Sequence, residues 1–392
     1  DYIQPEPEAP QREPVKSIAQ NWGEALDVSR FYGRTAELTT LTQWILQDNC
    51  RLVGIFGIGG IGKTALSVKL AEGVQNLFTY VIWRSLRNAP PLQTLLAALV
   101  PFLSGNQDIK ADVSSLLQCL RNHRCLVVLD NMETLLQTGN QTGYYRPGYE
   151  AYGELIEVLA ETRHQSCFVL TSREKPAQIA QFEGVELAVR TLPLNGSQEA
   201  ATALIEATRL TGSELEKHQL CDRYRCNPLA LKIVATSIRD LFDGEIGLFL
   251  QQDTLVFNGL RRLLDHQCDR LSPLETIVMY WLAINREWTS IAQLQDDIIP
   301  AVSNAQLLEA LEGLTWRSLI EKRAGNYTQQ PVVMEYVTER LIDRICDEIA
   351  DRSASVPLSS ASPLDLGPHS CGTGILPVQD CLFGKSLLQT HA

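Results

Sequence analysis

The stretch "GIFGIGGIGKTALSVKL" at residues 54–70 decides the fold of the first half of the chain. It fits the pattern G-x-x-x-x-G-K-[ST] at every fixed position, from Gly57 to Thr64. The apolar run "RLVGIFG" ends in this loop and predicts a strand buried on both faces of a parallel sheet. The segment "KTALSVKLAEGV" behind it has helical character. Strand, loop and helix in this order are the context in which the pattern binds nucleotide phosphates.

The residues of the loop have distinct roles in such a site. Backbone N–H groups of the loop and the start of the following helix form a nest for anions. The glycines allow the φ values and the close approach that this requires. Lys63 would reach the β- and γ-phosphate oxygens, and the Thr64 hydroxyl would bind Mg²⁺. The predicted phosphate-binding residues are Gly57, Ile58, Gly59, Gly60, Ile61, Gly62, Lys63, Thr64 and Ala65.

Further strands and helices alternate after the loop. "TYVIWRSL" is strand-like, and "CLVVLD" (125–130) and "CFVLTSR" (167–173) are candidates for buried strands. Apolar stripes at helical spacing over 92–103 and 113–120, and a helix near 151–163, lie between them. Strands that alternate with helices predict an α/β domain of three layers with a parallel sheet, the fold class of P-loop NTPases.

Two strand ends carry candidate catalytic residues. The run "LVVLDNME" delivers Asp130 to the carboxyl end of a strand, where it would hold Mg²⁺ through water. The next residue is Asn131, so a water-activating carboxylate is missing from the expected place. Glu133 is a substitute base, or alternatively an exposed residue at a helix start. Arg173, after "VLTS", would sense a γ-phosphate, or alternatively pair with a surface acid.

Composition excludes several classes of protein. The 392 residues are 45% hydrophobic and 20% charged, as in ordinary globular proteins. A net charge of −12 argues against bulk binding of nucleic acid or anionic membranes. No apolar run has the roughly 18 residues of a membrane span, and the first residues do not resemble a signal peptide. The ten cysteines are too sparse for a disulfide scaffold, so we expect a reducing, cytoplasmic location.

The pattern after the sheet divides the chain further. We expect a linker or disordered arm over 1–30, the nucleotide-binding domain over 31–190, a helical domain over 191–265, and a winged-helix domain over 266–350. "NGSQEAATALIEATRL" opens a helix behind Ser197, and "SLIEKRAGNYTQQ" is a hairpin that turns at 324–326. Residues 351–392 are rich in Ser, Pro and Gly and are expected to be a disordered tail. The missing first Met suggests a longer parent chain.

Four motifs together resemble one family. "FYGR" (31–34), "VVLDN", "LTSR" and "NPLAL" occur in the order and spacing of the NB-ARC class of STAND signalling ATPases. "NWGEALDVSRFYGR" and "VIWRSLRNAPP" are similar to bacterial members that carry WD40 repeats downstream. The resemblance implies that the 167–171 strand lies between the strands that carry the loop and Asp130. It also implies an adenine site made by Phe31, Tyr32, Gly33, Arg34, Pro228 and Leu229.

The chain also departs from the family. The two acids that often end the second strand are Asp130 and Asn131 here. The Met-His-Asp motif, whose His touches the ADP β-phosphate, aligns best with Gln329-Gln330-Pro331. Gln330 still offers an amide donor, but Pro331 has neither a carboxylate nor a backbone N–H. The resemblance therefore predicts an ADP contact that is weaker or built differently.

The resemblance implies a molecular switch that binds ATP or ADP with Mg²⁺, hydrolyses ATP slowly, and self-associates when ATP opens it. Flanking sensor or effector domains, such as WD40 repeats, would be its partners. One alternative is a turnover ATPase, against which Asn131 argues. Another is a DNA-binding regulator; its recognition helix over 303–316 would carry Glu309 and Glu312, which repel phosphates. A zinc site at His218, Cys221 and Cys226 lacks a fourth ligand.

Overall fold

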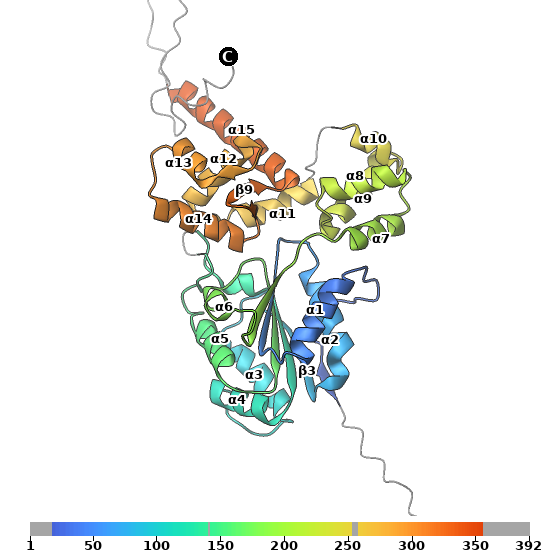
Figure 1. Cartoon of the computed structure of the whole chain (residues 1–392), viewed down its shortest axis with the longest axis vertical. Helices are drawn as coiled ribbons and strands as arrows, with labels where there is room; N and C mark the ends of the chain where they lie inside the picture. The colour runs from blue at the N-terminus through green and yellow to red at the C-terminus, as the bar shows by residue number, and fades with distance from the viewer. Residues whose placement is uncertain (1–17, 140–141, 253–257, 356–392) are drawn as a thin grey trace, which may run out of the picture.

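A six-stranded parallel sheet forms the centre of the first half of the chain (Figure 1). The computed structural model describes residues 18–139, 142–252 and 258–355. The strand order is β1-β3-β4-β5-β2-β6. The strands are β1 (Ala19–Asn21), β2 (Leu52–Phe56), β3 (Tyr80–Ser85), β4 (Cys125–Asp130), β5 (Cys167–Ser172) and β6 (Val189–Pro193). We call residues 19–193 the sheet domain.

Helices cover both faces of this sheet, as the alternation of elements predicts. Leu126 and Val128 of β4 pack toward α1 and α2, whereas Val127 and Leu129 pack toward α3, α4 and α5. Successive side chains of a strand point to opposite faces, so a run that is apolar throughout must be covered twice. The helices are α1 (Thr35–Leu46), α2 (Lys63–Val74), α3 (Leu92–Leu103), α4 (Val113–Asn122), α5 (Ala151–Glu161) and α6 (Ala177–Phe182). The predicted α/β fold class is confirmed.

The position of β5 brings the predicted site residues to one edge. β5 pairs with β2 on one side and with β4 on the other, as the family resemblance implies. The carboxyl ends of β2, β5 and β4 are therefore neighbours, and they carry the phosphate loop, Thr171 and Asp130. Open parallel sheets bind their ligands at this edge.

The ends of the sheet domain differ from the prediction. Residues 1–30 are predicted as an arm, but β1 pairs with β3 through Gln20 and Val81 and extends the sheet, and Val28 is buried. Pairing uses backbone groups, so the short segment "AQN" needs no apolar pattern to join. Residues 1–17 lie outside the described residues. At the other end, β6 continues to Pro193, past the predicted boundary at 190.

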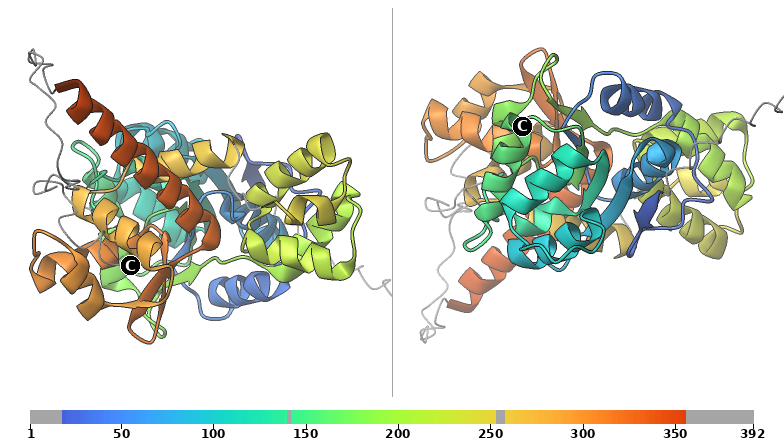
Figure 2. Two further views of the ribbon diagram at one scale, coloured as in Figure 1. Left: turned by 90° about the horizontal axis from the view of Figure 1, so that it is seen from above. Right: turned by 90° about the horizontal axis from the view of Figure 1, so that it is seen from below.

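Helices dominate the second half of the described chain. α7–α10 form a first group, which we call the helical unit, and α11–α15 with a small antiparallel sheet form the C-terminal unit. Figure 1 shows both groups at the same end of the sheet domain, and Figure 2 shows them beside each other when seen from above. The helical unit contains α7 (Gln198–Thr208), α8 (Glu214–Arg223), α9 (Pro228–Leu241) and α10 (Ile246–Leu250). Ser197 caps α7 as predicted, since its side chain accepts a bond from the Ala200 N–H.

The C-terminal unit has several short helices before a hairpin and one long helix after it. Its helices are α11 (Asn258–Cys268), α12 (Pro273–Asn285), α13 (Ile291–Asp297), α14 (Asn304–Trp316) and α15 (Pro331–Ser355). Its strands are β7 (Thr289–Ser290), β8 (Ile320–Arg323) and β9 (Asn326–Gln329), in the order β7-β9-β8. The hairpin turns at Ala324 and Gly325, which both have positive φ.

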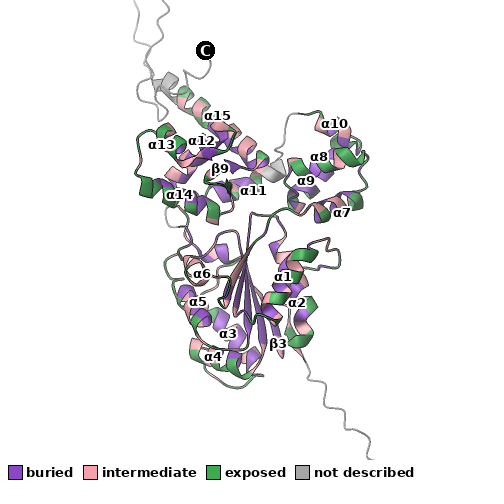
Figure 3. Cartoon of the chain, viewed as in Figure 1, coloured by how far each residue is buried: buried purple, intermediate pink, exposed green. Residues whose placement is uncertain are grey.

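Two predicted boundaries differ in this half. α11 crosses the boundary between 265 and 266, and a single apolar core runs from Ala201 to Leu341 through both units. α15 continues to Ser355, so 351–355 are helical rather than part of a tail. No proline or glycine interrupts the chain between Pro331 and Ser355, so nothing stops the helix at 350. The tail over 356–392 lies outside the described residues. Figure 3 shows the buried residues along the large sheet and inside both units.

None of the helices in residues 18–139, 142–252 and 258–355 combines the length and apolarity that crossing a bilayer requires.

Candidate functional site

The phosphate loop turns between β2 and α2 with two glycines at positive φ. Gly62 (φ 101°) is the N-cap of α2, and Gly60 has φ 79°. A Cβ atom on Gly60 would lie 2.5 Å from Cβ of Leu229 in α9. Side chains with a Cβ rarely adopt such φ values. Gly60 is therefore required both by the turn and by the close approach of the helical unit.

Lys63 begins α2 with its ammonium group held against the loop. Its Nζ donates to the carbonyl oxygens of Gly57 at 2.7 Å and Ile58 at 3.0 Å. Burial lowers the pKa of Lys63 to about 8, and the nearby Glu133 opposes this shift. The ammonium thus stays largely protonated at neutral pH. A buried cation at this position provides the charge that nucleotide phosphates need.

Thr64 and Asp130 meet as the predicted metal pair. Thr64 Oγ1 donates to Asp130 Oδ1 at 2.8 Å, and Thr171 Oγ1 donates to the same oxygen. Burial raises the pKa of Asp130, and the two hydroxyl donors work in the opposite direction. A hydroxyl and a carboxylate are the hard oxygen ligands that Mg²⁺ uses beside nucleotide phosphates. The donor set therefore fits Mg²⁺, which Thr64 would bind directly and Asp130 would hold through water.

Glu133 and Arg173 pair with each other. Arg173 Nε lies 3.2 Å from Glu133 Oε1, and the Arg173 backbone N–H donates to Glu133 Oε2 at 3.2 Å. Glu133 lies in the short helix Met132–Leu135 and is buried, so its alternative reading as an exposed residue is wrong. Pairing with a surface acid was one of the two roles predicted for Arg173. Its partner is instead the buried carboxylate of Glu133. Both carboxylate oxygens of Glu133 are therefore engaged by Arg173.

The segment 31–34 of the sheet domain contacts both the core of this domain and the helical unit. Phe31 packs against the core around α1 and α2, and Tyr32 packs against the core of the helical half. Gly33 has φ 59° and lies against the backbone of Ala200. Arg34 is buried and donates to the Ile61 carbonyl at 3.1 Å and to the Asn195 carbonyl at 2.5 Å. The guanidinium of Arg34 thus ties the phosphate loop to the connection before α7.

The first turn of α9 lies directly on the phosphate loop. Asn227 Nδ2 donates to the Gly59 carbonyl at 3.1 Å, and the Leu229 N–H approaches the Gly60 carbonyl at 3.3 Å. Asn227 Oδ1 also accepts from the backbone N–H groups of Leu229 and Ala230, so this buried side chain caps the helix. Pro228 is the first residue of α9. The bond from Asn227 to the loop was not predicted; the place of Asn227 before a helix-starting proline indicates a helix cap but not this partner.

Gln330 joins the same junction from the C-terminal unit. It lines a cavity of about 20 Å³ together with Gly59, Asn227 and seven other residues. This volume is enough for about one water molecule. Residues from the sheet domain, the helical unit and the C-terminal unit therefore converge beside the phosphate loop.

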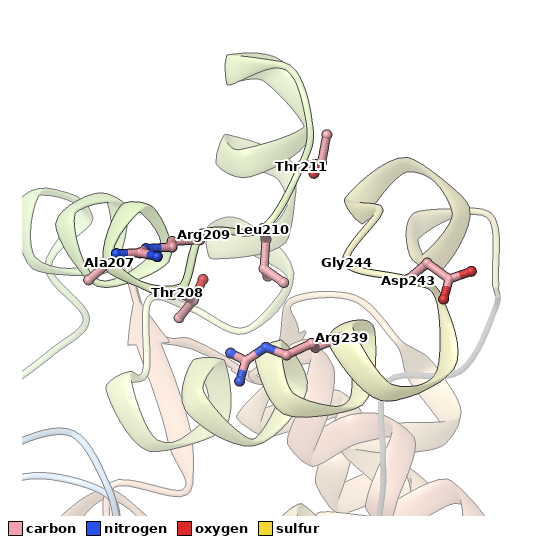
Figure 4. A pocket seen from close by; sticks show the side chains of 8 residues that line it. All are labelled: Ala207, Thr208, Arg209, Leu210, Thr211, Arg239, Asp243 and Gly244. Atoms are coloured by element: carbon pink, nitrogen blue, oxygen red, sulfur yellow. The ribbon is translucent and has the colours of Figure 1, made fainter.

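A hollow of about 480 Å³ lies away from this junction, between the ends of α7 and α9 (Figure 4). Its lining contains no predicted site residue. In the described parts of the chain, no group of three or more His, Cys, Asp or Glu side chains is arranged to hold a metal. His218 and Cys226 each contact Gln198.

Comparisons with known proteins agree with this geometry. Residues 34–183 match the NB-ARC domain family. A WD repeat-containing protein of Nostoc sp. (strain PCC 7120) is 51% identical over 350 residues, which are 84% of this chain and 28% of the relative. A protein of Mycobacterium tuberculosis (strain H37Rv) is 25% identical over 56% of this chain and 53% of its own length. The chain thus spans about a quarter and about half of these relatives.

A solved structure shows the same fold. The Walker-type ATPase of Pyrococcus abyssi matches with a TM-score of 0.55 at 14% identity, over 83% of this chain and 99% of its own. At this identity the likeness concerns the fold alone.

Proposed function

We propose that the chain, whose residues 34–183 match the NB-ARC domain family, is a conformational switch operated by ADP and ATP. The family implies a nucleotide-binding switch. In the proposed closed form, ADP with Mg²⁺ lies between the sheet domain, the helical unit and the C-terminal unit. ATP favours an open form that self-associates, and flanking domains such as WD40 repeats act as its sensor or effector.

The observation that carries the proposal is the contact between α9 and the phosphate loop. Gly59 and Gly60 are expected to surround the phosphates. Their carbonyl groups accept hydrogen bonds from the Asn227 side chain and the Leu229 N–H. A ligand bound to this loop changes the surface on which the helical unit rests. Only a ligand that binds two arrangements with different affinity shifts their populations. ATP differs from ADP by the γ-phosphate, so this group has to supply the difference in affinity between the two arrangements.

The adenine is proposed to lie between segment 31–34 and the start of α9. Phe31 and Tyr32 supply aromatic surface from one side, and Pro228 and Leu229 supply apolar surface from the other. Leu229 is partly exposed although it follows a buried N-cap, which supports this role. Gln330 is proposed to donate its amide to the ADP phosphates from the C-terminal unit. The nucleotide then holds three parts of the chain together.

We call the proposed covering of the adenine by the start of α9 the clamp. Replacing Pro228 by alanine tests it. Alanine is the better helix former, and the Asn227 cap remains, so α9 is expected to stay intact. Faster ADP dissociation and a larger hydrodynamic radius are expected, because the ring that covers the base is lost. Pro273→Ala is the matched control, since Pro273 begins α12 behind a serine cap in the same way. If the two variants release ADP at the same rate and are equally compact, the clamp does not exist.

Hydrolysis of ATP is proposed to be slow. Asp130 is proposed to hold the metal ion, Asn131 has no carboxylate, and Glu133 is paired with Arg173. Turnover is expected to lie well below roughly ten per second, and Glu133→Gln should lower it by less than about tenfold, whereas a general base contributes about 10²–10⁴-fold. Steady-state phosphate release measures the turnover of the unmodified protein and of Glu133→Gln. In the same assay, Asp130→Asn should lose the dependence of turnover on Mg²⁺. A hundredfold loss in Glu133→Gln would identify Glu133 as the base.

A DNA-binding function has less support. We propose that the C-terminal unit is a winged-helix domain whose helix α14 packs within the chain. Glu309 and Glu312 are exposed on α14, and like charges repel phosphates. The end of α14 meets the sheet domain, where the Lys175 N–H donates to the Trp316 carbonyl at 3.3 Å. Gly143 also lies against the Trp316 ring. This contact favours an intramolecular role.

A further inference from the structure

Four charged side chains form a buried cluster between the sheet domain and the C-terminal unit. Glu174 lies just after β5, and Arg270, Glu275 and Arg317 come from the C-terminal unit. The side chains of Glu174, Glu275 and Arg317 are each 3–4% exposed, and that of Arg270 is 23% exposed. The cluster therefore bridges two parts of the molecule that are far apart in sequence, where α14 lies above the sheet domain in Figure 1.

Both arginines converge on one oxygen of Glu174. Arg270 Nε lies 2.6 Å and Arg317 Nη1 lies 2.7 Å from Glu174 Oε1. Arg317 also pairs with Glu275 at 3.4 Å and donates to Thr142 Oγ1 at 2.9 Å. Glu174 Oε2 is buried and has no hydrogen-bond partner in the described part of the chain. Glu174 is thus the centre of the contact, held by charges that belong to the other unit.

The cluster also touches the residues expected to sense the γ-phosphate. Glu174 follows Arg173 directly in the sequence. Arg270 Nη2 donates to the backbone carbonyl of Glu133 at 3.0 Å and to that of Leu136 at 3.3 Å. Glu133 is the partner of Arg173. A shift of Glu133 and Arg173 would therefore move two groups that hold Arg270. These are the Glu133 carbonyl and the carboxylate of Glu174, the neighbour of Arg173.

Charges suit an interface that has to separate. Apolar side chains of similar volume would hold two surfaces together at least as well as a buried ion pair. Apolar surfaces are costly to expose, however, whereas separated charges are solvated by water. Removing one partner while the surfaces stay closed leaves the other charge buried and unpaired, which is strongly unfavourable. An ionic contact of this kind is stable when complete and opens when one member is displaced.

We propose that Glu174, Arg270 and Arg317, supported by Glu275, form a latch that holds the C-terminal unit on the sheet domain in the closed form. The latch is separate from the clamp at α9 and does not itself require nucleotide. Its release by a movement of Glu133 and Arg173 rests on the proposed switch. The three side chains keep the surfaces together until that movement breaks the convergence on Glu174.

Hydrogen exchange of the full chain measures the latch, because two backbone donors cross this interface. The Gly139 N–H donates to the Arg270 carbonyl, and the Lys175 N–H donates to the Trp316 carbonyl. In Glu174→Gln, exchange in peptides containing these two amides should rise at least about tenfold, with ADP and without it. Peptides from β4 and β5 should keep the exchange of the unmodified protein. Arg317→Gln removes a charge of the same latch on the side of the C-terminal unit and should raise the exchange of the same two amides.

The control is Glu348→Gln, which removes an exposed pair with Arg344 on α15 and should leave both amides unchanged. Unchanged exchange at Gly139 and Lys175 in both latch variants would overturn the proposal. So would an equal rise in β4 and β5, because the cluster would then merely stabilise the whole fold. The readout needs no nucleotide, so a failed latch is distinguishable from a failed switch, which the ADP dissociation of Pro228→Ala reports.

Discussion

Lys63→Ala is expected to abolish the binding of ADP and ATP. Lys63 is the cation of the phosphate loop, and its buried ammonium already lies within 3.0 Å of two loop carbonyl groups. Removing a charged donor from a buried contact leaves the phosphate charge uncompensated, which lowers affinity by about 10²-fold or more. Titration calorimetry with both nucleotides measures the loss.

Lys69→Ala serves as the control for this substitution. Lys69 is in the same helix but is partly exposed, and it pairs at 3.5 Å with Glu72. Its removal should leave nucleotide affinity within about twofold, because exposed ion pairs contribute little. Equal affinity of Lys63→Ala and Lys69→Ala for ATP would remove the site from residues 57–64.

Gly60→Ala is expected to separate the helical unit from the phosphate loop. Its φ of 79° is unfavourable for alanine, and the new methyl group would lie 2.5 Å from Cβ of Leu229. Gly62→Ala provides the comparison, since its φ of 101° is also positive but no atom lies within 4 Å of the added Cβ. Both variants strain the loop, and only Gly60→Ala displaces α9.

Small-angle scattering and ADP dissociation together separate these effects. Gly60→Ala should have the larger radius of gyration of the two variants and should release ADP fastest. Gly62→Ala should weaken ADP binding while it keeps the compact form. If Gly62→Ala expands as much as Gly60→Ala, strain in the loop explains the result and the contact with Leu229 is irrelevant.

Much of the fold was predictable because it rests on local patterns. The run "RLVGIFG" before the phosphate loop predicts β2, and the apolar run before Asp130 predicts β4. The place of β5 between them came from the family resemblance, since strand order is a property of tertiary structure. β1 was missed because its pairing uses backbone groups, and the end of α15 was misplaced because composition changes more abruptly than helical structure does.

The sequence predicted those residues of the candidate site that belong to a short motif. Thr64 and Asp130 are neighbours because each stands at a fixed point of a strand-end motif. The bonds of Asn227 to Gly59 and of Arg317 to Glu174 join residues 168 and 143 positions apart. Neither residue type nor spacing indicates such contacts. Arg34 shows the same limit: the resemblance implies a place beside adenine, whereas the structure reveals its contacts with Ile61 and Asn195.

The central claim is that the nucleotide decides whether the helical and C-terminal units rest on the sheet domain. The radius of gyration of the full chain, measured by small-angle scattering with ADP and then with a non-hydrolysable ATP analogue, tests it most directly. Both ligands must be at saturating concentration with Mg²⁺, as checked by calorimetry on the same samples. The account predicts a compact ADP form and a larger radius with the ATP analogue. The same radius with both bound nucleotides would contradict it.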